Sequence, residues 1–163
     1  MWEIMGYLPT QERNSVVFQG VMGINLDAKG RLSIPRKYRD QLTSSQNNKL
    51  VLTSHPHRCL LLYPSDAWEP IREKITQFSS FDAKLSVWKR LLVGFAEEMD
   101  LDASGRVTIP PSQREFAELN KRVMLVGQGS HFEIWGQDGW DRQISVIDDH
   151  PFEMPDGMEN FSL

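Results

Sequence analysis

Apolar and polar residues alternate with a period of two in several short segments of this 163-residue chain. Such alternation predicts β-strands with one buried face, because successive side chains of a strand point to opposite sides of a sheet. Two further apolar runs flank the polar turn at residues 54–57, which predicts a hairpin. The pattern therefore predicts a mainly β fold, with strands over residues 20–26, 50–53, 58–63, 122–126 and 131–135.

Four helices are predicted between these strands, over residues 36–42, from residue 64 onward, over residues 80–95 and over residues 112–119. Glu69 follows Asp66 by three residues, which is typical of a capping box at a helix N-terminus. The third helix carries an apolar stripe, which we expect to lie in the core or at a contact between subunits. The stripe consists of Phe81, Leu85, Trp88, Leu92 and Phe95.

One ten-residue pattern occurs twice, as LDAKGRLSIP at residues 26–35 and as LDASGRVTIP at residues 101–110. The same offset of 75 residues relates the aspartates, glycines, arginines and prolines of the two copies, and it also relates Arg39 to Arg114. A constant offset over so many positions indicates an internal duplication. Two repeats in a chain of this length favour a single shared core.

Each copy predicts a strand, a tight turn and a second strand. Asp27 and Gly30 occupy the first and fourth positions of the turn, where a type I turn favours these residue types. Alternation after the turn directs Arg31 outward and Leu32 toward the core. The Asp27 carboxylate can then reach the Arg31 guanidinium, either to lock the turn or to orient the arginine toward a phosphate or a guanine edge. These two roles are compatible.

Charge is distributed unevenly along the chain, whose formal net charge is −4. Residues 141–163 contain six acidic residues against Arg142, whereas residues 27–40 carry a local charge of +3. Residues 100–115, around the second motif, carry −1. This distribution places a basic patch on the first motif and an acidic tail behind it, and such a patch is either a solvated face or a surface for nucleic acid. We expect base contacts from Arg31 and Arg106, phosphate contacts from Lys29, Arg36, Lys37 and Arg39, and orienting roles for Asp27, Gly30, Asp102 and Gly105.

Other classes of function find little support in the sequence. No apolar run approaches the length of a membrane helix, and a single cysteine cannot form an internal disulfide, which fits a reducing cytoplasm. No nucleophile with a base, no paired carboxylates and no cofactor pattern indicate an enzyme or a small-molecule site. His55, His57 and Cys59 alternate and could share a metal, but Pro56 interrupts their strand and structural zinc needs four ligands. We therefore expect no cofactor and no metal.

The doubled motif, in residues 25–35 and 101–111, resembles the paired Asp-x-x-x-Arg motifs of the MraZ family. The similarity extends through residues 37–40, 59–64, 90–92 and 123–128, and so covers most of the chain. The resemblance implies a bacterial transcriptional regulator of the division and cell-wall gene cluster, built from two SpoVT-AbrB type repeats. It further implies a ring-shaped homo-oligomer that is associated with the nucleoid. Because a ring can engage several copies of a short site at once, we expect it to bind short direct repeats in its own promoter region.

The expected fold is β-rich (α+β): an interleaved, swapped-hairpin barrel of the AbrB type, formed by both repeats and surrounded by peripheral helices. A structural or antitoxin-like assembly module is the alternative, although two repeats in one chain count against it. The expected segments are an N-terminal extension (1–16), repeat 1 (21–68), a helical connector (69–96), repeat 2 (97–140) and an acidic C-terminal tail (141–163).

Overall fold

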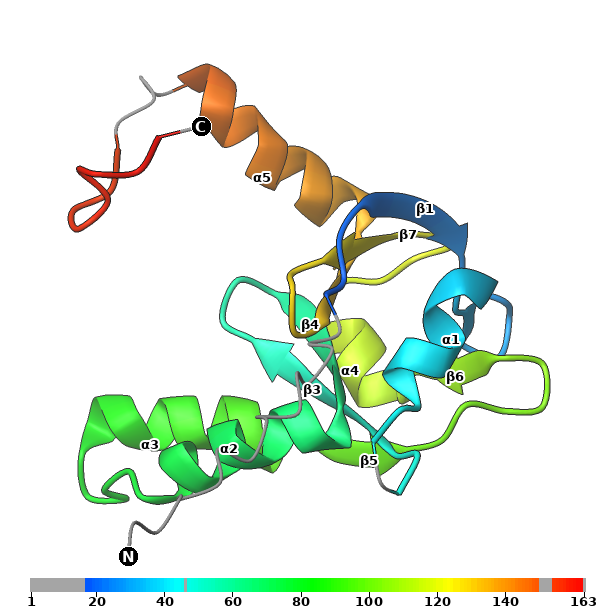
Figure 1. Ribbon diagram of the computed structural model, residues 1–163, viewed down its shortest axis with the longest axis horizontal. Helices are drawn as coiled ribbons and strands as arrows, with labels where there is room; N and C mark the ends of the chain where they lie inside the picture. The colour runs from blue at the N-terminus through cyan, green and yellow to red at the C-terminus, as the bar shows by residue number, and fades with distance from the viewer. Residues whose placement is uncertain (1–16, 46, 150–153, 163) are drawn as a thin grey trace, which may run out of the picture.

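The computed structural model describes residues 17–45, 47–149 and 154–162, so the expected N-terminal extension lies outside the described residues. Pairs of strands are separated by helices along the chain (Figure 1). In order they are β1 (Val21–Asn25), β2 (Arg31–Ser33), α1 (Arg36–Leu42), β3 (Leu50–His55), β4 (Cys59–Pro64), α2 (Ser65–Thr76), α3 (Ala83–Lys89), the π-helix η1 (Arg90–Gly94), β5 (Glu97–Met99), β6 (Arg106–Thr108), α4 (Pro111–Phe116), β7 (Arg122–Gly127), β8 (Phe132–Gly136) and α5 (Gln137–Asp149).

The strands form two antiparallel sheets that interleave the repeats. The larger sheet has the order β1-β7-β8-β4-β3-β5, and β2 pairs with β6 in a separate two-stranded ribbon. Repeat 1 thus contributes β1 to β7 of repeat 2, and repeat 2 contributes β5 to β3 of repeat 1. The predicted β-rich α+β fold is confirmed. The described strands do not close into a barrel, because β1 and β5 remain at opposite edges of the larger sheet while β2 and β6 pair with each other.

The main core lies between the ribbon and the larger sheet. Leu32 and Val107 of the ribbon are fully buried, as the alternation of each motif predicts. They belong to one apolar cluster with inward-facing residues of β3, β4, β7 and β8, such as Leu52 and Phe132. Burial of each such side chain contributes about 1.5–3 kcal/mol to the hydrophobic stabilisation of the fold. The ribbon is therefore anchored by its inner face.

A second apolar cluster covers the opposite face of β3 and β4. Here Tyr63 and Trp135 of the sheet pack with Trp68 of α2. Because both faces are covered, β3 and β4 consist of almost continuous buried residues. The buried hydroxyls of Thr53 and Ser54 donate hydrogen bonds of 2.6 Å to the carbonyls of Leu92 and Leu91 in η1, so the helical connector is tied to the sheet.

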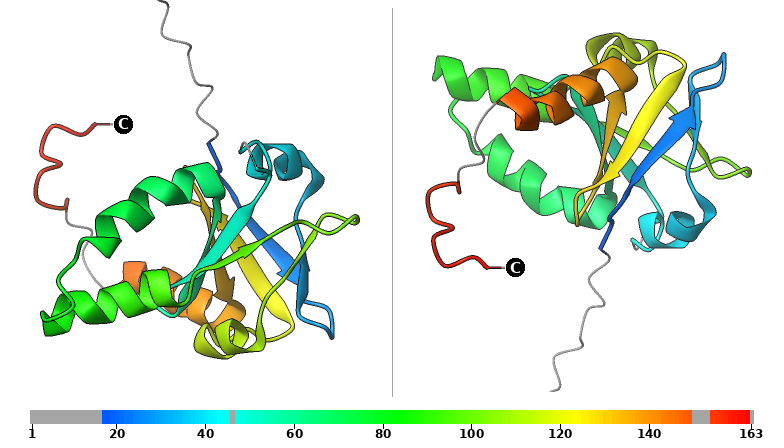
Figure 2. Two further views of the ribbon diagram at one scale, coloured as in Figure 1. Left: turned by 90° about the horizontal axis from the view of Figure 1, so that it is seen from below. Right: turned by 90° about the horizontal axis from the view of Figure 1, so that it is seen from above.

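Helices α2 and α3 both extend away from the sheets on the same side of the molecule (Figures 1 and 2). The predicted helix over residues 80–95 forms as α3 followed directly by η1, and it begins at Ala83 because the side chain of Asp82 caps it by accepting a hydrogen bond from the Leu85 amide. Phe81, Leu85 and Trp88 are exposed, so the expectation of core packing is wrong for this half of the stripe. Leu92 packs against the second cluster.

The predicted capping box of α2 does not form. This helix begins at Ser65, so its N-cap is Pro64 and not Asp66, and Pro64 makes no side-chain cap hydrogen bond. The Glu69 carboxylate instead accepts hydrogen bonds from Arg72, one turn further along the helix. The helix itself is confirmed.

Helix α5 is absent from the sequence prediction, which placed an acidic tail from residue 141. Trp140, Ile144 and Ile147 have helical spacing, but the acidic composition of this end obscured the pattern. Trp140 packs against Trp135 with a ring-centroid distance of 6.4 Å, whereas Ile144 and Ile147 are exposed. Among the described residues, no helix combines the length and the apolar character that crossing a membrane requires.

Candidate nucleic-acid interface

The first motif turn is fixed by hydrogen bonds that converge on Asp27. The Gly30 amide donates to the Asp27 carbonyl (3.0 Å), which closes the turn. Oδ1 of Asp27 accepts from the amides of Lys29 and Arg31, both at 2.9 Å, and Oδ2 accepts from Nε of Arg31 at 2.6 Å. Gly30 has a φ of 76°, a conformation that favours glycine. One carboxylate therefore fixes both the backbone of the turn and the direction of the arginine.

The second motif repeats this geometry. Oδ1 of Asp102 accepts from the amides of Ser104 and Arg106 at 2.9 Å, and Oδ2 accepts from Nε of Arg106 at 2.8 Å. Gly105 has a φ of 74°. The predicted Asp-Arg pair is thus confirmed in both copies. The expected local hairpin is not confirmed. The motif turn joins β1 to β2, but these two strands belong to different sheets.

The two arginines lie on the same face of the β2-β6 ribbon. Arg31 is directly opposite Thr108, and Arg106 is directly opposite Ser33. Residues paired in this way point to the same side of a ribbon, so Arg31 and Arg106 share its outer face. The ribbon is extended at both ends by hydrogen bonds from the Ile34 amide to the Gly105 carbonyl (3.0 Å) and from the Ile109 amide to the Gly30 carbonyl (2.8 Å). Neither repeat can build this surface alone.

A second pair of arginines, Arg39 and Arg114, packs against the glycines of the motif turns. Nε of Arg39 donates to the Ile34 carbonyl (2.8 Å), and its guanidinium lies directly against Gly105 of the other repeat. Arg114 lies against Gly30 in the same way, where a Cβ atom would fall 2.7 Å from its guanidinium carbon. Each helix arginine therefore packs on the motif glycine of the opposite repeat. Sequence reasoning missed Arg114 as a site residue, although its offset from Arg39 marks it.

The remaining predicted contact residues are distributed around the first motif. Lys29 is exposed on the turn itself, and Arg36 and Lys37 are exposed in the first turn of α1. Nζ of Lys37 lies 4.7 Å from the ring centroid of Tyr38. Arg39 is half-buried, so a phosphate contact there remains a prediction alongside its structural role. Both motif turns protrude from the side of the molecule opposite the α2-α3 pair (Figures 1 and 2).

The histidines near β3 and β4 form no metal centre. The rings of His55 and His57 lie 4.7 Å apart, and Cys59 is fully buried. Burial raises the pKa of the Cys59 thiol, which keeps it protonated. Among the described residues, no three His, Cys, Asp or Glu side chains are grouped so that they could hold a metal ion.

Comparison with known proteins identifies the family. The family model described as "MraZ protein, putative antitoxin-like" matches residues 17–90 and 92–158. The chain belongs to the MraZ family. Proteins named "Transcriptional regulator MraZ" from Methylobacillus flagellatus and Azoarcus sp. are 54% and 53% identical to it, and each alignment covers 90% of this chain and 100% of the relative. The corresponding protein of Thiobacillus denitrificans is 44% identical over the same share of both chains.

The two segments that match the MraZ family model each contain one motif. Asp27 to Arg31 lies in the first segment and Asp102 to Arg106 in the second. In this member of the family, the two segments meet at the β2-β6 ribbon, where each supplies one strand and one outward-facing arginine.

We expect the motif glycines to contribute to the free energy of unfolding. Gly105→Ala should destabilise the protein by about 1–3 kcal/mol, because a side chain at this positive φ is strained and would also displace the Arg39 guanidinium. Gly129→Ala is a matched control: its φ is 79°, but nothing lies within 4 Å of the added Cβ. Urea unfolding of both variants measures the difference. Equal destabilisation would show that the Arg39 guanidinium adds nothing to the backbone strain.

We expect the pKa values of the two motif carboxylates to be lower than that of an ordinary aspartate. Hydrogen bonds from the amide and guanidinium of Arg31 lower the pKa of Asp27 below 3.8, and those of Arg106 act likewise on Asp102. A pKa lowered by folding means that each pair stabilises the fold above pH 3.8 and loses this effect as the pH falls through the folded value. Carbon-13 NMR titration measures both pKa values. Arg31→Gln should raise the pKa of Asp27 only partly, since the backbone amide remains.

Proposed function

We propose that this protein is a sequence-specific DNA-binding transcriptional regulator that acts without catalysis in the cytoplasm, on the nucleoid. The observation that carries the proposal is the pair of arginines on one face of the β2-β6 ribbon, each held by its own aspartate. Its relatives are named transcriptional regulators, which supports the regulatory part of the proposal. We also assign the interleaved repeats to the swapped-hairpin architecture of AbrB-type domains.

A two-stranded ribbon fits the DNA major groove, and an arginine is the side chain that most often reads guanine there. Arg31 and Arg106 bind Asp27 and Asp102 through Nε. Their terminal nitrogens, which make no hydrogen bond within the described residues, can then contact base edges. Lys29, Arg36, Lys37 and Arg39 surround the first motif and bind phosphates, which supply affinity but no sequence information. Because residues 100–115 carry a net charge of −1, the second motif binds more weakly.

The proposed target is a set of short direct repeats in the promoter region of its own gene, within the division and cell-wall gene cluster. In an assembly of several chains, each chain would present one β2-β6 ribbon as a binding head. Simultaneous binding of several heads would give enough affinity for sites that are individually short. Exposed apolar side chains support assembly into a ring-shaped homo-oligomer: Phe81 of the α2-α3 connection is fully exposed, and Trp88 and Ile147 are 44% and 66% exposed. Apolar surfaces of this kind mark contacts between proteins.

One experiment tests the proposal directly. Fluorescence anisotropy should show binding to a labelled fragment from upstream of the gene at concentrations at least about tenfold below those needed for a scrambled fragment of equal length. Both titrations are run at the same salt concentration, because phosphate contacts make every affinity salt-dependent. Equal affinity for both fragments would contradict sequence-specific regulation.

A non-catalytic assembly module is the second candidate. It is favoured by the antitoxin-like description of the family and by the exposed apolar side chains of α3 and α5. This alternative predicts a stable oligomer by light scattering together with no preference for the upstream fragment. Because both candidates predict an oligomer, the preference for the upstream fragment is the measurement that separates them.

A further inference from the structure

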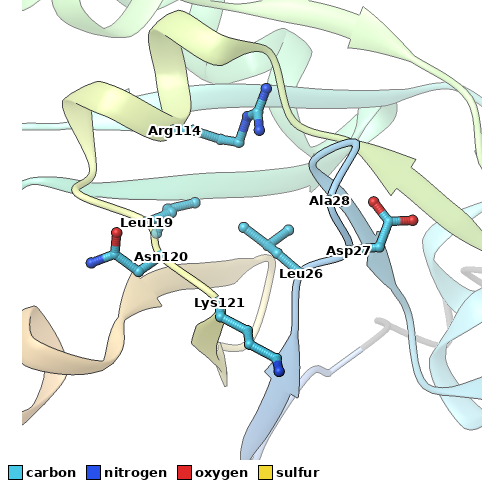
Figure 3. A pocket seen from close by; sticks show the side chains of 7 residues that line it. All are labelled: Leu26, Asp27, Ala28, Arg114, Leu119, Asn120 and Lys121. Carbon is cyan, nitrogen blue, oxygen red and sulfur yellow. The ribbon is translucent and has the colours of Figure 1, made fainter.

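A cleft of about 380 Å³ lies beside the first motif turn, and both repeats line it. Leu26 and Asp27 come from repeat 1, whereas Arg114, Leu119 and Lys121 come from α4 and the segment that leads to β7. Figure 3 shows Arg114 and Lys121 at opposite ends of the cleft, with Leu26 and Leu119 between them. The cleft thus presents a cation at each end and an apolar middle.

The charge of the cleft is positive. Its one carboxylate, Asp27, already accepts hydrogen bonds from Lys29 and Arg31, including one from the Arg31 guanidinium. Glu118, the nearest acidic residue to Lys121 in the sequence, pairs with Arg142. Within the described part of the chain, neither Arg114 nor Lys121 makes an ion pair. Both cations therefore remain available to an anionic ligand.

Arg114 and Arg39 occupy equivalent positions in the two repeats, but their Nε atoms differ in hydrogen bonding. Nε of Arg39 donates to the carbonyl of Ile34, but Nε of Arg114 is buried and has no partner among the described residues. A buried donor without an acceptor is costly, and such groups in native proteins call for an explanation. The guanidinium of Arg114 packs on Gly30 and lines the cleft. The terminal nitrogens of Arg114, which is half-buried, make no hydrogen bond within the described residues, so they remain available to an acceptor from outside the chain.

We propose that this cleft binds the sugar-phosphate backbone of the DNA strand that flanks the base contacted by Arg31. Arg114 and Lys121 each bind a phosphate, and the less polar deoxyribose between them lies over Leu26 and Leu119. A nucleic-acid backbone has this alternation of anion and sugar, and phosphates and sugars receive at least half of all hydrogen bonds between proteins and DNA. The inference rests on the proposed function. It means that residues of repeat 2 contribute to DNA binding at the first motif.

Lys121→Gln tests the proposal, because Lys121 is exposed and its neutral replacement leaves the fold intact. For each chain that engages the DNA, removing one phosphate contact should weaken binding about fivefold at 0.1 M salt and reduce the slope of log affinity against log salt by about one. The reduction should be equal on the upstream and scrambled fragments, since a phosphate contact reads no sequence. Lys84→Gln, on exposed α3, is the matched control and should bind like the unchanged protein.

Unchanged affinity and salt slope for Lys121→Gln would overturn the proposal, and so would a reduction confined to the upstream fragment. A double variant, Arg114→Gln with Lys121→Gln, should lower the slope by about two. If the unchanged protein bound neither fragment, the proposed function itself would fail, and this outcome is distinct from the others.

A phosphate group can also belong to a small metabolite. Calorimetric titration with inorganic phosphate at constant ionic strength separates this source from DNA. We expect no saturable binding, because a single phosphate cannot occupy both ends of the cleft and the apolar middle. Saturable binding that disappears in Lys121→Gln would assign the cleft to a free ligand and overturn the backbone assignment.

Discussion

Arg31→Ala is expected to weaken specific DNA binding by about 1–3 kcal/mol for each arginine-base interaction that it removes, which corresponds to a factor of about 5–150. The Arg31 side chain lies on the outer face of the ribbon and is oriented by a 2.6 Å bond to Asp27. In an assembly with several heads, every head is weakened in the same way, so the effect on overall affinity multiplies. Anisotropy titrations with the upstream fragment measure this effect.

Thermal stability should change little in Arg31→Ala, because the Arg31 side chain is partly exposed and such surface ion pairs contribute about 0–1 kcal/mol. Arg72→Ala is a suitable control, since it removes another exposed ion pair, with Glu69 on α2, far from the motif in sequence. If Arg31→Ala unfolded the protein while the folded fraction kept its affinity, Arg31 would serve only to lock the turn. The effect should also exceed that of Arg106→Ala, because the second motif lies in acidic surroundings.

The chemistry of each motif was predictable from the sequence because it is local. Every hydrogen bond that Asp27 makes joins it to a residue within four positions, so residue types and spacing were sufficient. The outward direction of Arg31 followed from alternation alone. The same residue types recur with the same spacing at Asp102 and Arg106, so the same hydrogen bonds could be predicted for the second motif.

The assembly of the two motifs into one surface was not predictable in the same way. The pairing of Arg31 with Thr108 and the contact of Arg114 with Gly30 join residues more than 70 positions apart. The sequence indicated that the repeats share a core but not which strands pair. For the exposed residues of α3, periodicity identified the apolar stripe, yet Leu85 and Trp88 remain exposed in the single chain. Pattern alone cannot distinguish a core from a subunit contact.

Specificity requires more contacts than one ribbon provides. Two arginines can distinguish only a few base pairs, and each mismatched pair typically costs about 1–3 kcal/mol against a genome of competing sites. If several chains assemble with their ribbons facing the same way, each further engagement becomes effectively intramolecular and adds affinity without any new kind of contact. The exposed apolar side chains of α3 and α5 support such an assembly.

Binding is therefore expected to depend on the phase of the target repeats. Neighbouring heads can reach the same side of the duplex only if copies of the site recur about every helical turn, or roughly 10 base pairs. Affinity should rise steeply as copies are added from one to four. Inserting about 5 base pairs between two copies should weaken binding by about tenfold or more, whereas inserting about 10 should restore part of it, because only the full turn returns the second copy to the same face. Affinity that is indifferent to both the number and the phase of the copies would contradict a multivalent assembly and leave each chain to bind alone.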